Sequence, residues 1–223
     1  MKPSLPVLVF QKVGNPPTNS HLKNQWITPK ALENWFIFLT KKGYHFLTPA
    51  NFGKPLPSKP IMLTFIGGFQ SFYSEVFPLL QKYKIPVTCA VAVDTLGTYN
   101  SWQDPYQEPW QNILTSKQLN ELVKSKLVQI ATLGLTGNDL TQLPPQQAQQ
   151  EIDESIFRLK KLYDIETCAV AFWPWARQNK KFDYNLSLPI FSACHGANRR
   201  SEKKVFRILQ PNWFTRLRLS IGR

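Results

Sequence analysis

The stretch TFIGGFQSFY, Thr64 to Tyr73, joins a run of apolar residues to a helical pattern through two glycines. Enzymes built on parallel strands often place catalytic groups at such a corner. Catalysis needs an acid, a base or a nucleophile, and the corner offers only the hydroxyl of Ser71. The stretch therefore predicts either a site whose reactive groups come from elsewhere or a site from which they have been removed.

Histidines and cysteines are the other candidates for chemistry. His21 and His45 fall in or near segments expected to be exposed, and no histidine has a second His or Cys at metal-binding spacing. His195 adjoins Cys194, but successive side chains on a strand point to opposite faces, which makes the pair a poor nucleophile and base. The cysteines are odd in number and lie in apolar runs: Cys89, Cys168 and Cys194. We expect buried thiols rather than a disulfide framework or a zinc site.

Aromatic side chains suggest binding rather than catalysis. Two Trp residues flank a proline at the end of an apolar run, and a third lies in a long aromatic loop, residues 95–112. Flat rings beside polar groups suit stacking on sugars. The candidate substrate-binding residues are Trp102, Asn138, Asp139, Trp173 and Trp175. The alternative, in which the Trp side chains fill packing space, stays open.

The elements that must position these residues follow from the apolar pattern. With 223 residues, 43% of them hydrophobic, the chain can bury one substantial core, and we expect a single domain over residues 1–223. Seven short apolar runs predict strands covered on both faces, as in a parallel sheet. They span residues 5–10, 60–65, 87–93, 128–133, 169–175, 190–194 and 205–209.

Helical patterns lie between these runs. Thr28 and Pro29 mark the start of the first helix, and Gly43 marks its end. Three further helices are predicted over residues 70–84, 115–126 and 146–163, the first of them with a kink at Pro78. The alternation of strand and helix predicts an α/β barrel or a doubly wound sheet.

The charge is strongly positive and unevenly placed. The net charge is +13; residues 1–74 contain one carboxylate, and the last 25 residues hold eight Lys or Arg against one Glu. Such a field favours anionic partners, among them phosphorylated glycans and lipid headgroups, although a solvated basic surface is the simpler alternative. From about residue 199 the basic residues alternate with aromatic ones, which fits an anionic membrane surface or a partner protein better than nucleic acid. This segment alternatively forms a last strand and helix of the barrel.

The location of the protein stays open at the level of sequence. No apolar run approaches the length of about 18 residues that a membrane span requires. Prolines interrupt the apolar stretch near the first residue, and no small-residue cleavage site follows it, so no signal peptide is expected. A chain of this length taken as complete would be cytoplasmic, whereas a trimmed chain would fit an extracytoplasmic protein.

Five longer segments are informative because of their order along the chain: VLVFQKVGNPP, KPIMLTFIGGFQSFYSEVFPLLQKYKIPVTCAVAV, LVQIATLGLTGNDL, AFWPWARQN and IFSACHGANRR. The first resembles VLMYHRV, and the second is similar, nearly position by position, to a pattern that begins KPVVLTFDDGY. Together they resemble the polysaccharide deacetylase family, the NodB-homology domain of carbohydrate esterase family 4. The resemblance implies a distorted (β/α) barrel of about seven strands.

Members of that family hydrolyse N-acetyl groups of glycans with a divalent metal ion, held by one Asp and two His, while a neighbouring Asp is the general base. The resemblance places Ile66 and Gly67 at the Asp positions of TFDDG, and Leu133 and Gly137 at the His positions of SHTxxH. Ile, Leu and Gly side chains neither donate an electron pair to a metal nor take up a proton. The resemblance therefore implies a domain that lacks the metal site and the catalytic Asp, and we expect no metal cofactor. Asp139 corresponds to an acidic residue that the family has after the second His. In the family this acidic residue is not a metal ligand.

We expect such a domain to be a pseudoenzyme that binds an N-acetylated amino-sugar polymer or assists its processing. The resemblance also places Trp175 where the family lines its substrate groove. Two alternatives stay open. One is an active hydrolase of carbon–nitrogen bonds other than peptide bonds, working through a different site. The other is an interaction protein that docks on an anionic surface or on a glycan-processing partner protein. Relatives of this family usually act outside the cytoplasm.

Overall fold

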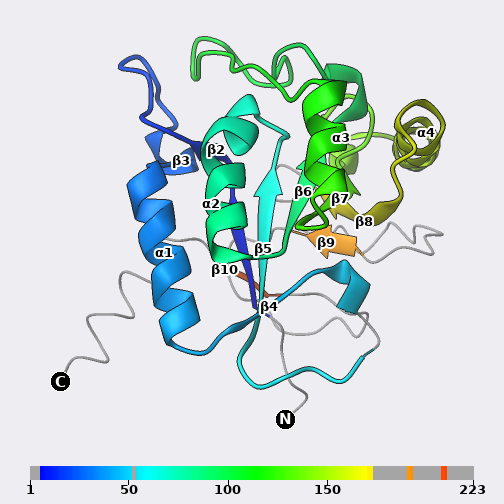
Figure 1. The fold of residues 1–223 in the computed structure, drawn as a ribbon. Helices are drawn as coiled ribbons and strands as arrows, with labels where there is room; N and C mark the ends of the chain where they lie inside the picture. The colour runs from blue at the N-terminus through cyan, green and yellow to red at the C-terminus, as the bar shows by residue number, and fades with distance from the viewer. Residues whose placement is uncertain (1–5, 52–53, 173–189, 193–206, 210–223) are drawn as a thin grey trace.

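A parallel sheet forms the centre of the computed structural model, which describes residues 6–51, 54–172, 190–192 and 207–209 (Figure 1). The strands follow the order β10-β1-β5-β6-β7-β8-β9, with β4 paired to the beginning of β5. Their bounds are β1 Pro6–Phe10, β4 His45–Leu47, β5 Pro60–Ile66, β6 Val87–Val91, β7 Val128–Thr132, β8 Thr167–Phe172, β9 Ile190–Ser192 and β10 Arg207–Leu209. A separate small sheet pairs β2 (Lys12–Val13) with β3 (Trp26–Ile27).

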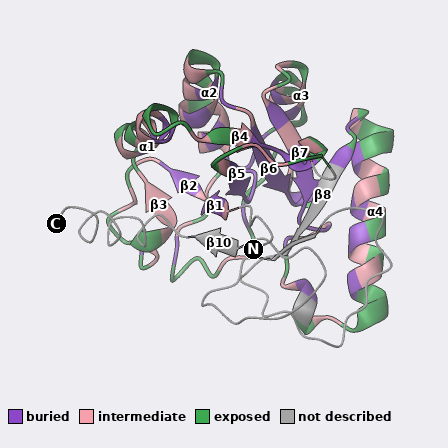
Figure 2. Ribbon diagram, turned by 90° about the horizontal axis from the view of Figure 1, so that it is seen from below, coloured by how far each residue is buried: buried purple, intermediate pink, exposed green. Residues whose placement is uncertain are grey.

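Helices cover the outside of the sheet. They are α1 Pro29–Lys41, α2 Phe77–Tyr83, α3 Ser116–Lys124 and α4 Pro145–Tyr163. Figure 2 views the barrel from the end at which β5 begins, and shows α1, α2 and α3 side by side and α4 apart from them, beside β8. The alternation of strand and helix and the parallel pairing confirm the predicted α/β class and the barrel of about seven strands, to which the short β4 adds one more.

Each of the seven predicted strands has a counterpart in the structure, although the ends differ. β8 begins at Thr167, two residues before the predicted start, and the last residues of that predicted run lie outside the described part. β4, with only three residues, was too short to give a pattern. Most of the basic segment from about residue 199 is likewise outside the described part, but its residues 207–209 pair with β1, which fits a last strand of the barrel.

The kink expected at Pro78 is wrong in its position. The irregular turn comes earlier, as a π-helical turn at Phe72–Val76, and α2 begins at Phe77 with Pro78 in its first turn. Proline is tolerated there because the first helical N–H groups have no carbonyl partner within the helix. The wide turn is therefore absorbed before the proline rather than caused by it.

Two apolar layers result from the alternation of side chains along the strands. One layer lies between the sheet and the helices; Phe65 belongs to it, with its ring centroid 5.0 Å from those of Phe10 and Phe72. The other layer faces the inside of the barrel and consists of Val7, Val9, Leu47, Met62, Ile66, Ala90, Ala92, Ala131 and Leu133. Ile66 and Leu133 thus point into the barrel rather than towards the helices.

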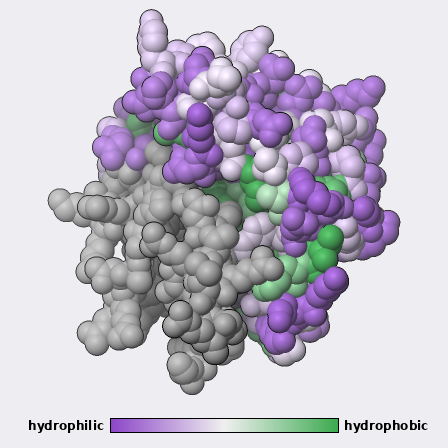
Figure 3. Space-filling view, turned by 90° about the vertical axis from the view of Figure 1, so that its left-hand side faces the viewer, coloured by the Kyte–Doolittle hydropathy of each residue, from purple (hydrophilic) through white to green (hydrophobic). Residues whose placement is uncertain are grey.

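Among the described residues that are visible in Figure 3, hydrophilic side chains predominate and hydrophobic ones form small patches. Among the described residues, no helix is both long enough and apolar enough to cross a membrane.

The start of α3 gives a test of the local structure. The hydroxyl of Thr115 accepts a hydrogen bond from the Gln118 N–H at 3.3 Å, and the Gln118 side chain accepts one from the Thr115 N–H at 2.9 Å. We expect Thr115→Ala to lower the free energy of unfolding by about 1 kcal/mol, because it removes the N-cap hydroxyl. Urea denaturation measures the change. Thr115→Ser keeps the hydroxyl and should unfold like the wild type; an equal loss in both variants would exclude the cap as the cause.

Candidate functional site

The family positions meet at the end of the barrel where the strands finish. Ile66 ends β5 and Gly67 follows it, whereas Leu133 follows β7, so these residues lie on either side of β6. The Gly67 N–H donates to the carbonyl of Ala90 at 3.0 Å, and the Leu133 N–H donates to that of Val91 at 2.8 Å. We call this the carboxyl end of the barrel. The structure thus brings together the positions that the resemblance singled out.

Aromatic rings occupy the space next to both glycines. A Cβ atom on Gly67 would overlap the ring of Phe69, and one on Gly137 would lie 2.8 Å from the Trp102 ring and 3.1 Å from the Cβ of Ala92. The two rings are neighbours, with centroids 6.3 Å apart. Both glycines also have positive φ, +107° and +77°, which an L side chain rarely adopts. A larger residue at either position would therefore require the rings and the backbone to move.

The other sequence candidates are placed as follows. Trp102 is half-buried against Gly137, so part of its ring packs rather than faces solvent. Asn138 is exposed and Asp139 is half-buried, in the connection that follows β7. Trp173 and Trp175 lie outside the described residues, and so does His195.

No group of three or more His, Cys, Asp or Glu residues that could hold a metal occurs in the described part of the chain. His21 is exposed, and so is His45, whose Nδ1 lies 2.7 Å from the Ser58 carbonyl oxygen. Cys89 is buried in β6, as expected.

A carboxylate from a distant helix holds the connection that contains Gly137. The Glu151 side chain, from α4, accepts hydrogen bonds from the backbone N–H groups of Leu135 at 2.8 Å and Thr136 at 3.1 Å. These bonds fix the backbone directly before Gly137, and so fix the surface on which the Trp102 ring rests.

The long loop after β6 turns an aromatic face outward. Its two arms pair antiparallel through Tyr99 and Asn112, and the Asn100 N–H donates to the Gln111 carbonyl at 3.2 Å. Side chains therefore alternate: Asn100 is buried, whereas Tyr99 and Trp110 are 53% and 45% exposed. The Trp110 indole N–H donates to the Gln103 carbonyl at 2.7 Å, which orients the ring. We call Tyr99 and Trp110, with the exposed Ser101 and Asn112 beside them, the aromatic face.

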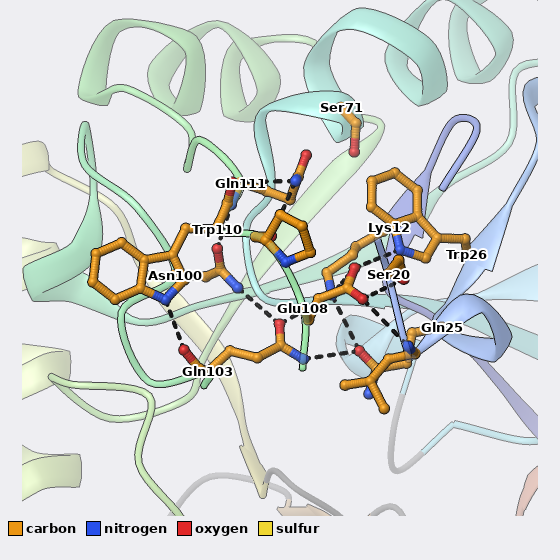
Figure 4. A network of polar contacts seen from close by, with 12 residues as sticks. Lys12, Ser20, Gln25, Trp26, Ser71, Asn100, Gln103, Glu108, Trp110 and Gln111 are labelled. Atoms are coloured by element: carbon orange, nitrogen blue, oxygen red, sulfur yellow. Dashed lines mark hydrogen bonds and ion pairs between the residues drawn. The ribbon is translucent and has the colours of Figure 1, made fainter. Parts of the chain in front are cut away.

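A buried ion pair ties this loop to the barrel (Figure 4). The ammonium of Lys12, the first residue of β2, lies 3.1 Å from the Glu108 carboxylate of the loop, and both side chains are shielded from solvent. Two amide oxygens complete the shell of the ammonium, those of Gln103 at 3.0 Å and Gln25 at 3.2 Å. The Phe69 ring also lies under it, with the centroid 5.4 Å from Nζ.

Hydrogen bonds satisfy the other side of the pair. The Glu108 carboxylate accepts from the Ser20 hydroxyl and from the Trp26 indole N–H, the latter at 2.7 Å. Burial opposes the ionisation of Glu108, but these hydrogen bonds and the charge of Lys12 outweigh it and lower the pKa of the carboxyl below its usual 4.5. Burial lowers the pKa of Lys12 more than Glu108 raises it.

Sequence reasoning missed this network and the role of Phe69. A single Lys in an apolar segment and a single Glu in a loop give no pattern by themselves. The one available signal is that Lys12 lies two residues after a strand predicted to be buried, where a charged side chain needs a partner.

Removing one charge of the buried ion pair should destabilise the protein strongly. Glu108→Gln leaves the buried ammonium without its counter-ion, and we expect the free energy of unfolding to fall by about 3–5 kcal/mol. Asp164→Asn is the matched control. Its partner Lys160 lies at the surface, and Asn accepts the same left-handed backbone, so the loss should stay below about 1 kcal/mol. Comparable losses in urea denaturation would contradict a special role for the buried pair.

The same pair predicts a dependence on pH. Because the pKa of Glu108 is lowered by folding, its contribution is complete above the unfolded value and disappears as the pH falls through the folded value. Stability of the wild type should therefore fall more steeply in acid than that of Glu108→Gln.

Named proteins with similar sequences match part of the chain. The poly-beta-1,6-N-acetyl-D-glucosamine N-deacetylase of Escherichia coli K12 is 32% identical over 115 residues, which cover 48% of this chain and 17% of that protein. The protein of the same name from Staphylococcus epidermidis is 26% identical over 114 residues, which cover 49% of this chain and 37% of that protein. The chain thus spans well under half of the length of these two relatives.

Solved structures share the fold over nearly the whole chain. A polysaccharide deacetylase from Bacillus cereus superposes with a TM-score of 0.74 at 20% identity, over 93% of this chain and 65% of that one. The deacetylase PplD of Streptococcus pyogenes gives 0.71 at 21% identity, over 93% of this chain and 92% of that one. IcaB from Ammonifex degensii gives 0.69 at 19% identity, over 96% of this chain and 95% of that one. These likenesses show the fold.

The family itself follows from the match to its sequence model. The polysaccharide deacetylase model covers residues 53–188, more than half of the chain and the part that contains all four positions at the carboxyl end of the barrel. The chain therefore belongs to the polysaccharide deacetylase family.

Proposed function

We propose that this domain is a polysaccharide deacetylase-like pseudoenzyme that binds an amino-sugar polymer without hydrolysing it. One observation carries the proposal: at the positions matched to the family's metal ligands and base, the barrel presents apolar side chains and glycines packed under the rings of Phe69 and Trp102.

The chemistry of these residues does not fit the family's metal. A divalent cation needs imidazole or carboxylate donors arranged around an open position. Ile66 and Leu133 are buried in the inner apolar layer, and Gly137 lies under the indole of Trp102. An ion there would lose its water and gain no ligand in exchange, which is strongly unfavourable.

The buried ion pair between Lys12 and Glu108 is a poor substitute for the lost site. Lys12 and Glu108 bind each other, and their remaining hydrogen-bonding capacity is used by neighbouring side chains. Both are shielded from solvent, so a substrate would have to open the loop to reach them. This arrangement favours a structural role over a replacement hydrolase.

The aromatic face supports binding of a sugar polymer. Tyr99 and Trp110 project flat rings into solvent, with Ser101 and Asn112 beside them as hydrogen-bonding groups. Such a combination suits sugar rings, whose CH groups pack on an aromatic ring while their hydroxyls bind polar side chains. The relatives named as deacetylases of poly-beta-1,6-N-acetyl-D-glucosamine suggest the polymer to test.

Metal content and acetate release together test the loss of chemistry. We expect chain purified with zinc, nickel or cobalt to retain no stoichiometric metal and to release no acetate from N-acetylglucosamine oligomers. The poly-beta-1,6-N-acetyl-D-glucosamine N-deacetylase of Escherichia coli K12, treated in parallel, serves as the active control. Stoichiometric metal with acetate release would overturn the proposal and the placement of Ile66, Gly67, Leu133 and Gly137. Acetate release without metal would favour a hydrolase that works through a different site.

The binding half of the proposal has its own test. We expect Trp110→Ala to weaken binding of β-1,6-linked N-acetylglucosamine oligomers about fivefold, which corresponds to about 1 kcal/mol of stacking. Phe157→Ala is the matched control, because Phe157 is a similarly exposed ring that lies on α4 rather than in the loop. Isothermal titration calorimetry measures both. Equal affinities of Trp110→Ala and the wild type would remove this face from the binding site.

A further inference from the structure

Lysines fill the connections that lead into four neighbouring strands. All strand pairs of the large sheet are parallel, so the connections before β4, β5, β6 and β7 meet at one end, opposite the carboxyl end. These connections, residues 41–44, 48–59, 84–86 and 124–127, contain seven lysines and neither Asp nor Glu. The seven are Lys41, Lys42, Lys54, Lys59, Lys84, Lys124 and Lys126, all of them exposed. We call them the lysine rim; Figure 2 looks at this end of the barrel.

Hydrogen bonds join these connections in pairs. The Lys59 ammonium donates to the carbonyl of Lys42 at 2.8 Å, and the His45 N–H donates to the carbonyl of Lys59 at 3.0 Å. At the next strands, the Val87 N–H donates to the carbonyl of Leu127 at 2.9 Å. The lysines therefore lie on adjoining segments, although they come from distant parts of the sequence.

Three lysines of the rim adopt a backbone conformation that is unfavourable for lysine. Lys59, Lys84 and Lys126 have φ of 48°, 54° and 61°, and among the described non-glycine residues only Asp164 shares this property. Gly and Asn adopt the left-handed region with less strain and are the usual residues where a helix ends in it. Lysine at these three positions lowers the stability of the fold relative to Gly or Asn. In exchange it provides a positive charge, which Gly and Asn lack.

Little in the described structure neutralises this charge. The nearby carboxylate Glu33 pairs with Lys30 and Lys82, and Lys160 pairs with the acids of the α4–β8 connection. Within the described residues, no ion pair involves a lysine of the rim. The positive charge of the rim lysines is therefore directed towards solvent.

We propose that the lysine rim is a docking surface for a lipid bilayer with anionic headgroups. Lysine carries a compact charge on a flexible stem, which suits attraction to a diffuse layer of phosphates. Recognition of one phosphate group or one polymer strand typically uses the planar fork of Arg or stacking Trp, and these four connections contain neither. This proposal is independent of the positions matched to the family's metal ligands, which lie at the carboxyl end of the barrel.

Vesicle sedimentation with the full chain tests the rim. We expect binding to phosphatidylcholine vesicles that contain phosphatidylserine, and none to phosphatidylcholine alone. The triple variant Lys59→Asn, Lys84→Asn and Lys126→Asn should bind about 100-fold more weakly, since each lysine near an anionic surface contributes about fivefold. Its melting temperature should be unchanged or higher, because Asn suits the left-handed backbone. Loss of binding with retained folding would separate docking from stability.

A second triple variant is the control. Lys23→Gln, Lys30→Gln and Lys117→Gln remove the same charge; Lys30 and Lys117 lie in the first turns of α1 and α3, away from the rim. This variant should bind within a few-fold of the wild type. Equal losses in both triples would mean that net charge alone drives binding, and would overturn the proposal. So would equal binding to both kinds of vesicle, or rim-dependent binding to soluble polyphosphate without vesicle binding, which would assign the rim to a polymer.

Discussion

Close packing at the carboxyl end of the barrel fixes the shape of the candidate site. The indole of Trp102 rests where residue 137 has no Cβ, and the ring of Phe69 rests where residue 67 has none. Protein interiors have the density of organic crystals, so a site of this kind cannot hold both a ring and a ligand side chain. Glycine at these positions, apolar residues in the inner layer and aromatic residues in the loop are one mutually dependent arrangement.

A buried ion pair ties the loop to the barrel, in addition to the loop's own antiparallel hydrogen bonds. Lys12 and Glu108 lose their hydration when the loop closes, and five neighbouring hydrogen-bonding or aromatic groups compensate only if the geometry is right. Such a pair adds little net stability compared with apolar packing, but it penalises every other position of the loop. The outward direction of Tyr99 and Trp110 follows from that fixed position, since their neighbours in the alternation are tied inward.

The sequence predicted those features that repeat along the chain. Continuous apolar runs revealed the strands, and the spacing of Ile152 and Leu159 revealed the buried stripe of α4. The family motifs revealed which positions meet at the strand ends. Contacts between single residues could not be predicted from the sequence. A lone Lys12 and a lone Glu108 form no pattern, and neither does an aromatic ring that packs on a glycine. The left-handed lysines were also hidden, because lysine is the residue that sequence rules least expect there.

Parallel strands give the barrel two ends with different chemistry, the aromatic face at one and the lysine rim at the other. Strands of five to seven residues separate them, which corresponds to roughly 16–23 Å of rise. Taken with the two proposals, the β/α scaffold would act as a spacer of fixed height. A polymer held on Tyr99 and Trp110 would run above the headgroups rather than among them.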